Sequence, residues 1–200
     1  MTDPFAQPAD PIARFLSAWE RVKATVPPGF DPAAMTLATV GGPGQPAART
    51  VLLRALTGRG FQFFTNYGSR KARELDEAGR AALCFYWPWL DEQVRVEGTI
   101  ERAGAEESDA YFATRPRGSQ LGAWASRQST PVASRAELEA RYREVERRFA
   151  AGDVPRPPFW GGYTLVPAAI EFWRAGEYRL HDRMLYVRDG DGWTRTRLYP

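Results

Sequence analysis

Between Met35 and Gly104 the sequence alternates short apolar segments with turn residues, and this spacing constrains the fold more than any other feature. The segments that predict strands are 35–40, 47–56, 61–66, 81–87 and 93–102. Turns rich in Gly and Pro separate the first three, and one short helix is predicted over 70–76, capped by Ser69. Connections this short favour antiparallel neighbours, because parallel pairs need long crossovers. We therefore predict a mostly β protein built on an antiparallel barrel, not a doubly wound parallel sheet.

Helical patterns flank this β region. Before it, Asp10 as N-cap and Pro11 at the first helical position precede an apolar stripe that runs through about Lys23. After it, the sequence predicts helices over 105–113, over 119–125 and from Ser134, where Glu137 completes a capping-box pattern. The chain closes with strands near 163–166, 169–173, 184–187 and 193–198. With 44% hydrophobic residues in 200, we expect one domain over 1–200, with 1–9 mobile.

Composition and charge exclude several classes of function. Lys and Arg number 27 against 24 Asp and Glu, a net charge of only +3, so we expect no nucleic-acid partner. His181 is the single histidine and Cys84 the single cysteine, which leaves no Cys/His metal cluster, and Cys84 is expected to be a small buried hydrophobe. There is no secretory signal pattern and no apolar run of the roughly 20 residues that cross a bilayer. We expect a soluble, cytoplasmic protein without a membrane segment.

Cations and hydroxyls gather in short motifs within this framework. Ser69-Arg70-Lys71 opens a helix, where a hydroxyl cap, free backbone N–H groups and two cations suit a phosphate; an ordinary capped helix is the alternative. Arg49 and Arg54 lie on one apolar strand. In a regular strand they face opposite sides, so a shared ligand requires a twist or bulge, and edge-strand charges are the alternative.

Three further motifs add to this inventory. The segment 179–183 reads RLHDR, and alternation along an extended strand would place Arg179, His181 and Arg183 on one face, which suits an anionic ligand; a solvent-facing charged strand is the alternative. The loops at 115–120 and 128–129 carry arginines and hydroxyls that turn chemistry alone would also explain. No nucleophile–base pair or glycine-rich nucleotide loop accompanies them. The inventory favours phosphorylated, planar ligands, with the chemistry supplied by a bound cofactor.

Taken together and in order, these motifs resemble the pyridoxine/pyridoxamine 5′-phosphate oxidase family. The most specific pieces are RPRGSQLGAW at 115–124 and RLHDR at 179–183, supported by FWGGY at 159–163 and EFW at 171–173. The resemblance runs from Asp10-Pro11 to the final RLYP. It implies an FMN-binding split β-barrel with flanking helices, assembled as a homodimer with FMN at the subunit interface.

The resemblance also implies roles for individual residues. For FMN it implies contacts from Arg49, Thr50, Val51, Leu52, Leu53, Phe64, Thr65, Arg70, Lys71, Gln93, Gln128, Ser129, Trp173 and Arg183. For the phosphate and ring of the substrate it implies Arg54, Tyr111, Arg115, Ser119, Arg179 and His181. Of these, Arg179 and His181 are the predicted catalytic residues, and no metal is implied.

The implied reaction is oxidation of pyridoxine 5′-phosphate or pyridoxamine 5′-phosphate to pyridoxal 5′-phosphate, a step of vitamin B6 metabolism. A hydride passes from the C4′ carbon of the substrate to flavin N5, and O2 reoxidises the flavin and yields H2O2. Two features depart from the family pattern: Arg54 stands where lysine is usual, and the chain starts close to the Asp10-Pro11 helix, without an Arg/Tyr-bearing N-terminal arm. The alternatives are another flavin oxidase or reductase on the same barrel, such as a phenazine-pathway oxidase, and a non-catalytic module that binds FMN or a B6 phosphate.

Overall fold

The structure, a computed structural model, describes residues 9–200. Its strands are β1 (Ala34–Gly41), β2 (Gln45–Leu52), β3 (Ala55–Leu56), β4 (Phe61–Asn66), β5 (Arg80–Trp87), β6 (Glu92–Arg102), β7 (Trp160–Arg174), β8 (Asp182–Asp189) and β9 (Gly192–Arg197). Its helices are α1 (Pro11–Thr25), α2 (Arg70–Ala78), α3 (Ala105–Thr114), α4 (Arg117–Ala125) and α5 (Arg135–Arg148). The strand pairs over these residues are antiparallel. The predicted mostly β class is therefore confirmed.

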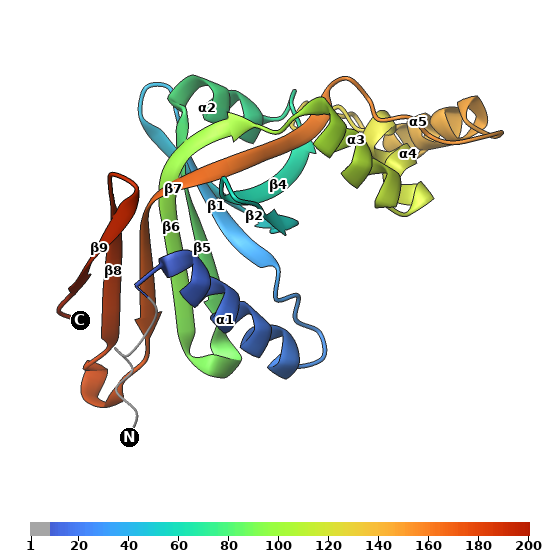
Figure 1. The fold of residues 1–200 in the computed structure, drawn as a ribbon. Coiled ribbons are helices and arrows are strands. Elements are labelled where there is room, and N and C mark those ends of the chain that lie inside the picture. The colour runs from blue at the N-terminus through green and yellow to red at the C-terminus, as the bar shows by residue number, and fades with distance from the viewer. Residues whose placement is uncertain (1–8) are drawn as a thin grey trace.

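The long strand β7 joins two parts of the molecule. The strands follow the order β2-β1-β5-β6-β7-β4-β3, and β8 and β9 extend the sheet from β7. The first residues of β7 pair with β4 and its last residues pair with β8. Opposite Gly98 the register shifts and leaves Ala168 unpaired, a bulge that bends β7. Glycine is required there, because a Cβ would lie 1.9 Å from the Val166 carbonyl oxygen. The bend directs β7 toward the β8–β9 hairpin at one side of the molecule (Figure 1).

Two hydrophobic clusters hold the elements together. The larger one lies between α1 and the curled sheet, where Phe15 packs its ring 4.9 Å from Phe61 and 5.2 Å from Phe85. Such aromatic pairs contribute about 0.5–1.5 kcal/mol each beyond the burial of their area. The smaller cluster, which includes Phe112 and Trp160, attaches α3 and α4 to the start of β7. Helices α3 to α5 therefore form a separate group beside the barrel (Figure 1).

Most boundaries agree with those expected from the sequence. Asp10 caps α1, since its carboxylate accepts a hydrogen bond from Ile12 N at 2.9 Å, and β4 has the predicted limits. The strand predicted over 47–56 is wrong as one element, because it breaks after Leu52 and resumes at Ala55. The two strands predicted at 163–166 and 169–173 are one strand, because the bulge accommodates Pro167 within β7.

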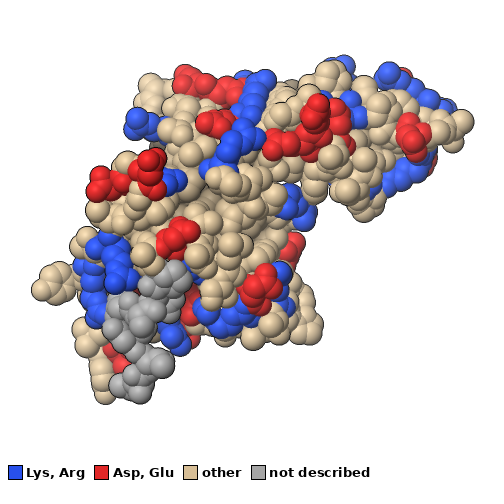
Figure 2. Space-filling model, in the orientation of Figure 1, with Lys and Arg blue, Asp and Glu red and all other residues tan. Residues whose placement is uncertain are grey.

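Three surface features complete the fold. Cys84 is half-buried, not buried, because it faces away from its core neighbours Leu83 and Phe85 on β5. Helix α5 has no buried residue among those described, and its charges pair along the helix, as Arg135 does with Glu139 at 2.8 Å. Figure 2 shows basic and acidic side chains intermingled over the described residues on the face of the molecule seen in Figure 1.

The mobile segment predicted at 1–9 falls, for residues 1–8, outside the described residues. None of the described helices has the length and apolarity needed to cross a membrane.

Candidate functional site

A cavity of about 520 Å³ opens between β2, β4 and the helices α3 and α4. Many of the residues expected to bind ligands line it, and we call them the cavity group: Thr50, Val51, Leu52, Arg54, Phe64, Thr65, Lys71, Tyr111, Arg115, Ser119 and Gln128. They come from two strands, three helices and three connections, and up to 78 positions separate them in the sequence. The fold therefore gathers the predicted FMN and substrate contacts of this group in one place.

Stacked aromatic rings form one wall of the cavity. Phe64 and Tyr111 lie with ring centroids 4.1 Å apart and planes 22° from parallel. Trp160 continues the stack, 5.5 Å from Phe64 at 11°. Phe64 reaches this wall because alternation along β4 turns Phe63 into the larger core and Phe64 to the other face. Rings held in parallel planes present a flat apolar surface, which suits a planar ligand.

Two arginines bring positive charge to this aromatic wall. The Arg115 guanidinium lies 4.6 Å from the centre of the Trp160 ring, and the Arg54 guanidinium lies 5.9 Å from that of Tyr111. Arg115 Nη1 is buried and has no hydrogen-bond partner among the described residues. Burial lowers the pKa of Arg115; Tyr111 raises it and the charge of Arg54 lowers it further. A buried, unpaired N–H beside a second cation is costly unless an anion completes it. This corner of the cavity therefore fits a phosphate group.

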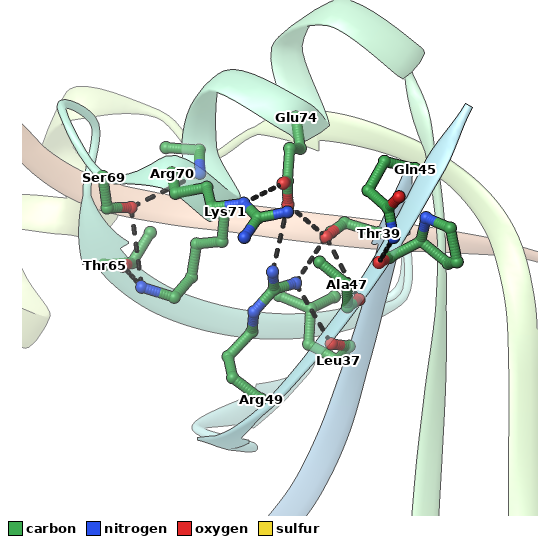
Figure 3. Close-up of polar contacts among 12 residues, drawn as sticks. Leu37, Thr39, Gln45, Ala47, Arg49, Thr65, Ser69, Arg70, Lys71 and Glu74 are labelled. Atoms are coloured by element: carbon green, nitrogen blue, oxygen red, sulfur yellow. Dashed lines mark hydrogen bonds and ion pairs between the residues drawn. The ribbon is translucent and has the colours of Figure 1, made fainter. Parts of the chain in front are cut away.

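A second cationic corner forms at Lys71. Its Nζ donates to Gln128 Oε1 at 3.1 Å and to Thr65 Oγ1 at 3.3 Å, and it lies 3.5 Å from Ser69 Oγ (Figure 3 draws the contacts with Thr65 and Ser69). Burial lowers the pKa of Lys71, and repulsion from Arg49 lowers it further, although Glu74 raises it. The hydrogen bonds of this ammonium group are all to neutral oxygens among the described residues. A phosphate can exchange for them with a gain in charge pairing.

The remaining predicted residues on this side lie beside the cavity without lining it. Ser69 caps α2 as predicted, and Arg49 turns toward α2, where it meets the Glu74 carboxylate at 3.0 Å. Arg70 meets the same carboxylate at 2.6 Å. Arg54, which belongs to the cavity group, follows the break after β2, so it lies apart from Arg49, which turns toward α2. Leu53 is buried in the larger core; Ser129, at φ +70°, follows Gln128 in the loop after α4.

Sequence reasoning missed several residues of this region. Asn66, Gly122, Ala123, Ser126 and Trp160 also line the cavity. Trp160 belongs to the FWGGY motif at 159–163, but nothing in the sequence shows that its ring would lie against the Arg115 guanidinium. Glu74 was also missed, although its position four residues after Arg70 on a helix is a signal for an ion pair.

The other predicted residues lie elsewhere, and we call them the hairpin group: Gln93, Trp173, Arg179, His181 and Arg183. Gln93, Trp173 and Arg183 are cross-strand partners on β6, β7 and β8. The ring of His181 lies 4.7 Å from that of Trp173, and its Nδ1 accepts a hydrogen bond from Gly176 N at 3.2 Å. The cavity of about 520 Å³ is lined by none of the hairpin group, and a separate cavity of about 250 Å³ is lined by Gln93 and Trp173 and by none of the cavity group. Within one chain the predicted site is therefore divided.

The prediction that 179–183 forms an extended strand is wrong for its first residues. Glu177–Arg179 is a 3-10 turn, Tyr178 and Arg179 have φ of +55° and +63°, and β8 begins at Asp182. The reason is the reversal from β7 into β8: Gly176 packs against Leu180, whose carbonyl oxygen would lie 2.1 Å from any Cβ at position 176. Arg179 therefore lies exposed at the tip of the connection, not on one strand face with His181 and Arg183.

The chain matches known sequences over nearly its whole length. Residues 19–149 match the family described as pyridoxamine 5′-phosphate oxidase, and residues 160–200 match a pyridoxine 5′-phosphate oxidase C-terminal dimerisation region. A Rubrobacter xylanophilus protein named pyridoxine/pyridoxamine 5′-phosphate oxidase is 60% identical over 193 residues, covering 96% of this chain and 87% of the relative. A Myxococcus xanthus protein of the same name is 56% identical, covering 96% of this chain and 93% of the relative.

Two solved structures resemble this fold. PhzG from Burkholderia lata 383, in complex with tetrahydrophenazine-1-carboxylic acid, has a TM-score of 0.91 and 32% identity, covering 99% of this chain and 95% of that one. A pyridoxamine 5′-phosphate oxidase-related, FMN binding protein from Nostoc punctiforme has a TM-score of 0.75 and 20% identity, covering 94% and 96%. The second likeness concerns the fold alone and confirms the predicted split β-barrel with flanking helices. With the family match over most of its length, the chain belongs to the pyridoxine/pyridoxamine 5′-phosphate oxidase family of oxidoreductases.

Proposed function

We propose that the protein is an FMN-dependent oxidase that converts pyridoxine 5′-phosphate or pyridoxamine 5′-phosphate to pyridoxal 5′-phosphate, with O2 as acceptor and H2O2 as product. The observation that carries this proposal is the corner formed by Arg115 and Arg54 against the aromatic wall. A phosphorylated pyridine has the two properties that this corner fits: a dianionic group for the guanidinium groups of Arg115 and Arg54, and a flat ring beside Tyr111. The names of relatives at 56–60% identity support the same substrate.

The residues around Lys71 fit the phosphate of FMN. Lys71 is held by neutral oxygens, and Arg49 and Arg70 lie beside it. With two cationic corners in or beside one cavity of about 520 Å³, the chain has a place for the phosphate of the cofactor and another for that of the substrate. When bound, the flavin supplies the hydride acceptor, while the protein supplies position and electrostatics.

We further propose that two chains complete each site. The hairpin group of one chain would meet the cavity group of the other, because the groups are apart within one chain and the sequence 160–200 matches a dimerisation region. Four of the five hairpin residues lie in that region: Trp173, Arg179, His181 and Arg183. The sheet that carries them continues from the barrel through β7, which supports one domain over the chain.

In such a site His181 would orient the substrate ring. Its Nδ1 accepts the Gly176 N–H, so a neutral imidazole carries its proton on Nε2. Nε2 can then donate a hydrogen bond to an oxygen of the substrate. Arg179, exposed at the tip of the same turn, would add a positive charge next to it. Holding the substrate carbon in line with its acceptor lowers the barrier by orientation.

A phenazine-type reaction is a second candidate function. It is favoured by the likeness to PhzG, which covers nearly the whole chain and includes a bound tetrahydrophenazine carboxylic acid. A carboxylate carries one negative charge, whereas two arginines and Ser119 line the anion corner of this cavity. That arrangement favours a phosphate ester.

Peroxide release tests these two functions directly. The FMN-loaded protein is given pyridoxine 5′-phosphate, pyridoxamine 5′-phosphate, unphosphorylated pyridoxine or a reduced phenazine carboxylic acid under air. We expect H2O2 with the phosphorylated vitamers and much less with pyridoxine. Turnover of the phenazine without turnover of either vitamer phosphate would select the second function, and FMN binding without any turnover would indicate a binding module.

A further inference from the structure

A buried carboxylate lies behind the proposed phosphate seat of Ser69, Arg70 and Lys71. Glu74, one turn further along α2, is only 5% exposed. It accepts hydrogen bonds from three elements: from Arg70 Nε on α2 at 2.6 Å, from Arg49 Nη2 on β2 at 3.0 Å and from Thr39 Oγ1 on β1 at 2.5 Å. Figure 3 shows the carboxylate reaching down from α2 to the guanidinium that rises from β2.

These contacts keep Glu74 ionised. Burial raises the pKa of its carboxyl, but the hydrogen bonds from Thr39, Arg70 and Arg49 outweigh this and lower the pKa below its usual value. An isolated buried carboxylate would be strongly unfavourable, so the surrounding cations and hydroxyl are a condition for its presence. The same bonds hold the cations, because each partner is fixed by the other.

Arg49 is the more firmly held of the two cations. In addition to Glu74, its Nη1 donates to the Leu37 carbonyl at 3.2 Å and to the Thr39 hydroxyl. Its side chain is 20% exposed, whereas that of Arg70 is 57% exposed and has Glu74 as its ion-pair partner. Without the carboxylate, Arg70 would be free to sample many rotamers in solvent.

Glu74 itself does not line the cavity, whereas Lys71, three residues earlier on the helix, does. The carboxylate therefore cannot touch a ligand there and can act only through its cations. Arg49, Arg70 and Lys71 with Glu74 have a net charge of +2. A phosphate monoester carries about −1.5 to −2 near neutral pH, so the charges of seat and phosphate match.

We propose that Glu74 is a positioning residue for the flavin phosphate, which orients Arg49 and Arg70 from behind and sets the charge of the seat to that of a phosphate dianion. This inference rests on the proposed FMN-dependent function. A residue that only braced α2 against the β1–β2 hairpin would support the binding of every flavin equally. A carboxylate that only repelled the phosphate would weaken FMN binding, and its removal would strengthen it.

The test compares FMN with riboflavin, which has the same ring and ribityl chain and no phosphate. Flavin-free, full-length protein is titrated with each ligand, and quenching of flavin fluorescence gives the dissociation constants. We expect Glu74→Gln to weaken FMN binding about 10-fold or more, the effect of loosening charge-assisted hydrogen bonds, and to leave riboflavin binding unchanged. Glu77→Gln is the matched control, because it removes the same charge from an exposed position of the same helix and should change neither constant.

Three outcomes overturn the proposal. Tighter FMN binding by Glu74→Gln would make the carboxylate a competitor of phosphate, equal weakening of both flavins would make it a brace, and unchanged constants would give it no role. Failure of the unmodified protein to bind FMN would instead reject the proposed function and this inference together. If Glu74→Gln does not fold, Glu74→Asp and Thr39→Val replace it: both should lower FMN affinity selectively, by about 3-fold, since charge is kept and one contact is weakened. Unchanged FMN affinity in both of these variants would also overturn the proposal.

Discussion

In the cavity group, cationic and aromatic side chains line one shared cavity, whereas in the hairpin group Gln93 and Trp173 line a separate cavity of about 250 Å³ and the arginines are paired with a carboxylate or exposed. Arg115 presents a buried, unpaired Nη1, and Lys71 is held only by neutral oxygens. Arg183 is instead bound to Glu171 at 2.8 Å, and Arg179 is exposed. The first region can attract a phosphorylated ligand by itself. In the second region Arg179, His181 and Arg183 line neither this cavity nor the cavity of about 250 Å³ beside Gln93 and Trp173, so their role depends on what is placed against them.

A buried glutamate stands behind each region. Glu74 holds Arg49 and Arg70, and Glu171, 4% exposed on β7, holds Arg183 together with Arg95. Each carboxylate binds two arginines, and the family resemblance predicts ligand contacts for Arg49, Arg70 and Arg183 but not for Arg95. The difference between the regions thus lies in the space in front of the cations. Cavity residues should control affinity, and hairpin residues should control turnover.

The largest effect is expected at Arg115. Arg115→Met should raise the KM for pyridoxine 5′-phosphate roughly 10- to 200-fold, because a charged hydrogen bond to phosphate contributes about 1.5–3 kcal/mol. The thermal stability of the ligand-free protein should stay equal or rise, since an unpaired buried cation is removed. Steady-state kinetics and a melting curve measure both. Arg143→Met on exposed α5 is the control, and a normal KM in Arg115→Met would remove the cavity from substrate recognition.

A smaller loss, in turnover, is expected in the hairpin group. Arg179→Ala and His181→Ala should each lower kcat/KM about 10-fold or more, roughly 1.4 kcal/mol, mainly through kcat, with FMN content unchanged. His181→Asn separates catalysis from structure, because its side-chain oxygen can still accept the Gly176 N–H while the Nε2 donor is lost. Recovery of normal turnover in His181→Asn would show that His181 only shapes the turn.

Glu171 should make its contribution through pH-dependent stability. Burial raises the pKa of this carboxyl, but Arg183 and Arg95 lower it below the ordinary value. A depressed pKa gives stability that is present above the unfolded-state pKa of about 4.3 and is lost as the pH falls through the folded value. Glu171→Gln should therefore cost about 1–3 kcal/mol at pH 7, limited by the exposure of Arg95, and should flatten the acid limb below pH 5. Denaturant unfolding at several pH values measures this, and an unchanged acid limb would refute it.

The smallest effect is expected for Arg54→Lys. The positive charge beside Tyr111 persists, and only the forked geometry of the guanidinium is lost. KM for the vitamer phosphates should change by about 3-fold or less, whereas Arg54→Ala should raise it at least 10-fold. Equal KM values for all three proteins would show that Arg54 is a surface charge without contact to substrate.

Local signals in the sequence predict most helices and strands, but they do not predict contacts between segments that are distant in the sequence. Asp10 and Ser69 were identified as caps because capping is decided within a few residues. The turn at Glu177–Arg179 was missed because the approach of Gly176 to Leu180 is visible only once β7 and β8 pair. The support of Arg115 by Trp160, 45 positions later, has no local signal either. The family resemblance implied the candidate site residues and an interface site, but it did not show which of these residues one chain brings together in a single cavity.

A mixed dimer tests most directly whether cavity and hairpin groups from different chains make one site. One chain carries Arg115→Met and the other carries Arg179→Ala with His181→Ala; the two are co-expressed with different affinity tags, and the doubly tagged dimer is isolated. If the site is shared, one of the two sites in each mixed dimer is intact, so activity per dimer, measured at substrate concentrations well below KM, should rise to about half that of the unmodified protein, far above either parent. If each site lies within one chain, every site in the mixed dimer has a defect. Activity no higher than the average of the two parents would then contradict the account.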